Sequence, residues 1–205
     1  MVSIIAGFGE LDFQPAGGFK FWELAETMLD VYNLTRQQLK LFDTTMKLES
    51  RGYGGPFLPK DTNYRNINID SRVISTASKL MDHLADVVGD ITRLGKSVVL
   101  SSLPLHALYV VDLMVYPTHA ASLLQFGFNT NNSSNVAVLI MTPEHYDRSG
   151  EHLVGSQAMR VRQLTIMGFK VMCVNMQMAN KLMMHPKKLR KYLQKLYTDA
   201  CKAKK

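Results

Sequence analysis

The amino-acid sequence predicts an α/β protein, in which an N-terminal helical segment is followed by a small mixed-sheet α/β core. Three observations support this prediction. Apolar residues recur at helical spacing through much of the chain before Ser97. The run "VAVLIM" at 136–141 is continuously apolar, as a strand buried on both faces would be. After Ser97, strand-like and helix-like segments follow one another, which is the pattern of an α/β core.

The chain before residue 97 predicts helices. Apolar residues at helical spacing occur in three segments, residues 19–34, 36–51 and 71–94. Gly52 and Gly95 lie where the second and third of these helices are expected to end. Between them, residues 53–66 contain two Gly and two Pro and are expected to form a loop. We therefore expect a helical region over residues 1–96 and an α/β domain over residues 97–205.

The second part predicts strands and helices in a mixed order. A short apolar segment over 96–107 is expected to turn at Pro104, and the β-branched and aromatic segment 108–116 predicts a strand. The apolar run 136–141 predicts the next strand. The remaining elements are a helix from about Gly150 to Met167, a strand over 169–175, a short segment "MANKLMM", and a basic helix that opens at Pro186.

The composition narrows the classes of protein to consider. The two cysteines, Cys173 and Cys201, lie in an apolar run and a basic tail, a spacing that suits neither a disulfide framework nor a zinc knuckle. No apolar run reaches the roughly 18 residues of a membrane span. The first 35 residues contain no arginine and five acidic residues, unlike a mitochondrial transit peptide. The chain is therefore either not targeted by this segment or a fragment of a longer protein.

The charge of the chain is strongly asymmetric. Residues 1–151 hold 12 Lys and Arg against 16 Asp and Glu, whereas residues 152–205 hold 12 Lys and Arg and one acid, Asp199. The balances of −4 and +11 give the net charge of +7. A basic block on an acidic chain indicates a polyanion partner, with RNA or DNA first and an anionic membrane next. The alternative is a solvated helix face with a purely structural role.

Three motifs carry a family resemblance. "AGFGELDFQPAGGFKFWELAETML" resembles the start of the conserved C-terminal region of the FAST kinase domain-containing family, with Asp12 where that family has Asn. "HALYVVDLMV" is similar to the family's Gly-Tyr-x-Val-Asp strand. Residues 136–196 resemble a RAP domain, through an apolar strand, a turn with Pro143, His145 and Tyr146, a basic helix, a Gly-Phe-x-Val strand and a closing helix.

This resemblance implies a PD-(D/E)XK-like fold, related to very-short-patch repair endonucleases. It also implies a role in the mitochondrial matrix with RNA, in processing, stability or ribosome assembly. The kinase of the family name is not carried over, because the sequence contains no GxGxxG loop and no His-Arg-Asp loop.

A nuclease of this fold would need two acidic residues that share Mg²⁺ or Mn²⁺. Asp112 stands at the position of the first acid, and it either belongs to a site or is bonded to backbone amides or an arginine. The second strand has Leu139 and Met141 where an acid and a basic residue would be expected. Glu144 or Asp147 could replace them. We therefore expect no cofactor unless this metal-dependent endoribonuclease alternative holds.

RNA binding without catalysis is the favoured function. The candidate contacts are basic residues of the C-terminal third together with one aromatic residue: Arg160, Arg162, Lys170, Lys187, Lys188, Arg190, Lys191, Lys195 and Tyr146. No metal site is expected at His145 and His152, because their spacing across a loop is not that of zinc ligands. The partners would be mitochondrial mRNA or rRNA. The Met-rich segment 176–184 could add ribosomal or assembly-factor proteins, and a third alternative is a structural subunit of a ribonucleoprotein particle.

Overall fold

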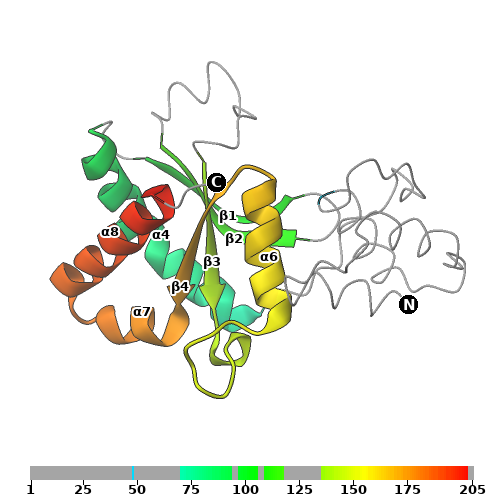
Figure 1. Cartoon of the computed structure of the whole chain (residues 1–205). Helices are drawn as coiled ribbons and strands as arrows, with labels where there is room; N and C mark the ends of the chain where they lie inside the picture. The colour runs from blue at the N-terminus through cyan, green and yellow to red at the C-terminus, as the bar shows by residue number, and fades with distance from the viewer. Residues whose placement is uncertain (1–47, 49–69, 94–96, 106–108, 118–134, 203–205) are drawn as a thin grey trace, which may run out of the picture.

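The computed structural model describes Leu48 and residues 70–93, 97–105, 109–117 and 135–202 (Figure 1). The predicted helices over 19–34 and 36–51 lie outside the described residues, except for Leu48, which is helical. The elements in chain order are α4 (Ser71–Thr92), β1 (Val98–Leu105), β2 (Tyr109–Tyr116), β3 (Val136–Met141), the short 3₁₀ helix η2 (Pro143–His145), α6 (Gly155–Ile166), β4 (Lys170–Asn175), α7 (Met176–Leu182) and α8 (Pro186–Lys202).

The four strands form one mixed sheet in the order β1-β2-β3-β4. The pairs β1–β2 and β2–β3 are antiparallel, and the pair β3–β4 is parallel. Because parallel neighbours need a crossover connection, the chain leaves β3, forms α6 and returns to the same sheet as β4. The predicted mixed-sheet α/β class is confirmed, whereas the PD-(D/E)XK-like assignment stays a prediction.

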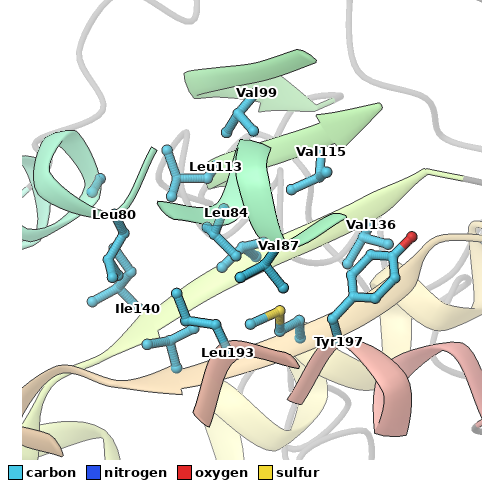
Figure 2. Packing of buried hydrophobic residues seen from close by; sticks show 14 of the residues in the cluster. Leu80, Leu84, Val87, Val99, Leu113, Val115, Val136, Ile140, Leu193 and Tyr197 are labelled. Atoms are coloured by element: carbon cyan, nitrogen blue, oxygen red, sulfur yellow. The ribbon is translucent and has the colours of Figure 1, made fainter. Parts of the chain in front are cut away.

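Helices cover both faces of the sheet. Figure 1 shows α4, α7 and α8 on one face and α6 on the other. The larger core cluster joins α4, α8 and the sheet, and includes Leu84, Ile140 and Leu193 (Figure 2). The smaller cluster, which includes Leu139 and Leu164, lies on the α6 face. All six residues of β3 are buried, as predicted from its continuous apolar run.

Two predicted elements need correction. The segment that was expected to turn at Pro104 is strand β1, in which Pro104 pairs with Val110 of β2. Proline is tolerated there because β1 is an edge strand of the sheet in the described part of the chain, and one side of an edge strand needs no N–H donor. Helix α6 begins at Gly155 rather than near Gly150, since Gly150 adopts a φ of +73° in the preceding loop.

The expected boundary between residues 96 and 97 is not tested, because most of the first region lies outside the described residues. Helix α4, however, shares its core with the sheet, where Leu80 and Leu84 are fully buried. Among the described helices none is long and apolar enough to cross a membrane.

Candidate functional site

The antiparallel ladder between β2 and β3 opens at Asp112. The paired residues end at Leu113 and Val138. A ladder continued in the same register would place Val111 opposite Ile140, and the two would exchange main-chain hydrogen bonds. Instead, Oδ2 of Asp112 accepts a hydrogen bond from the amide nitrogen of Ile140 at 2.7 Å. The carboxylate therefore replaces a main-chain acceptor at the point where the two strands separate.

Arg160 of α6 fills the same opening. Its guanidinium donates a hydrogen bond to the carbonyl oxygen of Val110, and Nη2 lies 3.8 Å from Oδ1 of Asp112. The side chains of Arg160 and Asp112 are 16% and 7% exposed. Burial raises the pKa of the Asp112 carboxyl, while Arg160, the Ile140 amide and His145 act in the opposite direction. The pair is thus an internal polar contact with hydrogen bonds to both partners, as buried charges require.

The other two acids of the nuclease alternative point elsewhere. Oε1 of Glu144 lies 3.1 Å from the guanidinium of Arg72 at the start of α4. Oδ1 of Asp147 accepts hydrogen bonds from the Ser149 hydroxyl and from the amides of Ser149 and Gly150. The Ser149 hydroxyl is the main cause that lowers the pKa of this exposed carboxyl, and the Gly150 amide lowers it further. Within the described ranges there is no group of three or more metal-ligating side chains. The arrangement around Asp112 therefore favours the backbone-and-arginine interpretation over a shared cation site.

The loop after β3 is held by His145. Its Nδ1 accepts a hydrogen bond from the amide of Thr142 at 3.2 Å, and its carbonyl oxygen accepts one from the amide of Val154. A β-bridge between Tyr146 and Leu153 closes the loop. Burial lowers the pKa of His145, and the positive charge of Arg160 lowers it further. The neutral imidazole is therefore the form that fits this loop.

We expect the folded state to lose stability as the pH falls below the ordinary histidine value. The pKa of His145 is lowered from 6.5 in the folded protein, so the unfolded chain binds the proton more tightly. This contribution is present above pH 6.5 and is lost as the pH falls toward the lower folded-state pKa. Protonation of Nδ1 would also remove the acceptor for Thr142. Urea denaturation at about pH 7.5 and about pH 5 measures the effect.

His145→Asn provides the test of this prediction, because its amide oxygen can accept from Thr142 but does not titrate. The variant should show a smaller difference between the two pH values than the wild type. His152→Asn is the matched control, since His152 is exposed in the same loop. An unchanged pH dependence in His145→Asn would contradict the assignment.

Helix α8 presents exposed lysines opposite its buried side. Leu189, Leu193, Tyr197 and Ala200 are buried. Lys187, Lys188, Lys191 and Lys195 are exposed, and no ion pair in the described part of the chain uses them. Arg190 differs, because it forms an ion pair with Asp90 of α4.

The remaining candidate contacts are less accessible. Lys170 and Arg162 are half-buried, and Arg162 makes further interactions. Tyr146 packs against the smaller core cluster. The hydroxyl of Tyr192 accepts a hydrogen bond from the amide of Asn175 at 3.2 Å. Tyr197 of α8 is buried as well. Tyr146, the candidate for base stacking, and the two tyrosines of α8 therefore serve packing or hydrogen bonding in this fold.

Sequence reasoning missed two ion pairs that bind α4 to the rest of the domain. Arg72 pairs with Glu144 of η2 at 3.1 Å, and Asp90 pairs with Arg190 of α8. The only available signal was the opposite charge of these residues, which cannot identify partners so far apart in the sequence.

Comparison with curated proteins finds one distant relative. The chain is 25% identical to the Fas-activated serine/threonine kinase of Mus musculus over 163 residues. The match covers 68% of this chain and 32% of the mouse protein, so the chain corresponds to less than two thirds of that relative's length. This similarity supports the FAST-like part of the predicted resemblance.

No family model matches the chain, and no solved structure matches it. The RAP domain and the PD-(D/E)XK-like fold therefore stay predictions from the sequence motifs.

Proposed function

We propose that this protein binds RNA without cleaving it, in mitochondrial RNA processing or stability or in assembly of the mitochondrial ribosome. The observation that carries the proposal is the exposed lysine face of α8, which lies opposite the buried side of the helix. The choice of RNA as the polyanion rests on the motif resemblance, and the similarity to the mouse Fas-activated serine/threonine kinase supports the FAST-like part of that resemblance. The place in the cell and in metabolism rests on the motif resemblance.

The lysines lie along one line of the helix. Lys188, Lys191, Lys195 and Lys202 follow one another at spacings that place them on one face. At a rise of 1.5 Å per residue, the line from Lys188 to Lys202 is about 21 Å long. A row of this length can contact several consecutive phosphates.

The binding would depend on phosphates rather than on bases. Ammonium groups recognise phosphate as point charges, and such contacts carry little sequence information. Tyr192 and Tyr197 point into the domain and leave no exposed ring on the described part of α8 for stacking. Arg160 is not assigned to the RNA contacts, because its guanidinium is directed to Val110 and Asp112. The proposed contacts are Lys187, Lys188, Lys191 and Lys195, with Lys170 and Arg162 at the margin.

The double variant Lys191→Glu/Lys195→Glu is expected to weaken binding of a labelled single-stranded RNA on the order of tenfold or more at roughly 0.1 M salt. The slope of log K against log salt should become shallower by about 1.4, since two phosphate contacts are lost. Fluorescence anisotropy across a salt series measures both quantities.

The matched control is Lys79→Glu/Arg148→Glu, which changes the net charge equally at two exposed positions of α4 and the loop after β3. We expect this control to retain most of the affinity. Equal losses in the two double variants would show that net charge alone attracts RNA, and would contradict an interface on α8.

A second candidate function, a structural subunit of a mitochondrial ribonucleoprotein particle, is favoured by exposed methionines. Met178 and Met184 are 46% and 82% exposed on and after α7, and flexible Met side chains suit protein contacts. Retention in a large particle at high salt, with no affinity for the free RNA, would favour this function over the first.

A further inference from the structure

Among the strands that the structure describes, β4 lies at one edge of the sheet. It is the last strand in the order β1-β2-β3-β4, so only one side of its backbone faces β3. The amide of Lys170 donates to the carbonyl oxygen of Asn135, which lies at the start of β3. Since successive residues of a strand point their N–H and C=O groups to opposite sides, those of Val171, Cys173 and Asn175 point away from β3.

Of these outward-pointing groups, the amide of Asn175 has a hydrogen-bond partner. The amide of Asn175 donates to the hydroxyl of Tyr192 from α8. No hydrogen bond within the described residues satisfies the outward N–H and C=O of Val171 and Cys173. Both residues are half-buried rather than exposed. Main-chain groups at such depth in a protein are normally paired, so this stretch of the edge has the geometry of a site for another strand.

Helix α8, which lies beside this edge, carries exposed lysines. The contact between Tyr192 and Asn175 shows which face of α8 lies along β4. Lys188 and Lys195 are four residues before and three residues after Tyr192, so they border that face from the exposed side of the helix. Asp199, four residues after Lys195, is the one acidic residue of α8. Helix α6, on the other face of the sheet, contains no acidic residue.

We propose that the free edge of β4 docks an extended acidic segment of a protein partner, which adds a strand to the sheet at Val171 and Cys173. The main-chain groups of the partner would pair with the outward groups of β4, and its acidic side chains would meet Lys188 and Lys195. A second copy of this chain fits poorly, because two such edges would bring lysines against lysines. RNA fits poorly as well, since it does not offer the alternating N–H and C=O groups of a strand.

The test uses a labelled peptide of alternating Val and Glu, matched to the six residues of β4, with the wild-type protein and no RNA. We expect saturable binding and slower amide exchange at Val171 and Cys173. Replacing Glu by Lys in the peptide should weaken binding at least about tenfold. Two N-methylated peptides can be made, one methylated at the odd residues and one at the even residues. One of them should not bind and the other should bind, because only one set of amides faces the edge.

Protein variants provide a second test. Val171→Pro removes an outward donor that the ladder to β3 does not use, and proline is tolerated at such edge positions, so it should abolish binding. Val171→Thr keeps the N–H and a β-branched side chain, and should bind like the wild type. If Val171→Pro fails to fold, the N-methylated peptides answer the same question with an unaltered protein.

Three results would overturn the proposal. The first is the absence of binding by the acidic peptide. The second is equal binding by both N-methylated peptides, which would mean attachment by charge alone. The third is protection of the Val171 and Cys173 amides by an RNA oligomer and not by the peptide. Because the peptide is tested without RNA, failure here leaves the proposed RNA function separately testable.

Discussion

Replacing Asp112 by leucine is expected to lower the free energy of unfolding by about 3 kcal/mol. The substitution removes the acceptor for the buried amide of Ile140 and the anion beside Arg160. Breaking a buried pair costs about 3–5 kcal/mol, and the low end applies because Arg160 is 16% exposed and keeps its bond to Val110. Urea denaturation near neutral pH measures the change.

Asp112→Asn separates the hydrogen bond from the charge. The amide oxygen can still accept from Ile140, and the charge that burial disfavours in Asp112 is gone. We therefore expect a clearly smaller loss than in Asp112→Leu. The double variant Asp112→Leu/Arg160→Met should lose less than the sum of the single variants, because each single variant leaves one unpaired charge and the double variant leaves none. Additive losses would show that the two side chains do not act as a pair.

Replacing Leu193 by alanine is expected to lower the free energy of unfolding by about 2–5 kcal/mol. Leu193 is 0% exposed, and Figure 2 shows it among the buried side chains from α4 and the sheet. The smaller side chain leaves a cavity under α8 that the packed neighbours can fill only partly. Since α8 carries the proposed RNA contacts, binding should weaken with temperature as the helix loosens. Thermal denaturation monitored by circular dichroism gives the stability change.

The control for this prediction is Lys191→Ala. Lys191 is exposed two residues earlier on the same helix, and alanine is a strong helix former. Its effect on stability should stay within about 0.5 kcal/mol, although it removes one proposed phosphate contact. A comparable loss of stability in both variants would contradict the assignment of the apolar side of α8 to the core.

The elements that the sequence predicts well are those whose residues repeat one local pattern. Strand β3 is apolar throughout, and α8 combines Pro186 at its start with a regular apolar stripe, so each was located closely. Strand β1 was missed as a strand because Pro104 is a turn signal unless the strand is known to be an edge. That knowledge depends on the whole sheet and is not present in the segment itself.

The site was only partly predictable, because charge counts do not show the direction of a side chain. Lys191 and Arg160 contribute equally to the basic block, yet one is exposed and the other pairs with a carboxylate of β2. Asp112 was identified as an acid that must have a partner, since it stands alone in an apolar strand. Which partner it has is decided by the separation of β2 from β3, and no local sequence pattern encodes this separation.

The substitution of a side-chain acceptor for a main-chain one at Asp112 affects how related sequences should be interpreted. Selection for folding alone would keep a short acceptor at this position, whether or not a chain retains enzymatic activity. A motif search that counts such a residue as one of two metal ligands would then predict hydrolytic activity for chains in which the acid only completes the hydrogen bonds between two strands. In such proteins, the residues at neighbouring positions would say more about metal-dependent hydrolysis than the acid itself, above all the residue at the position of Leu139.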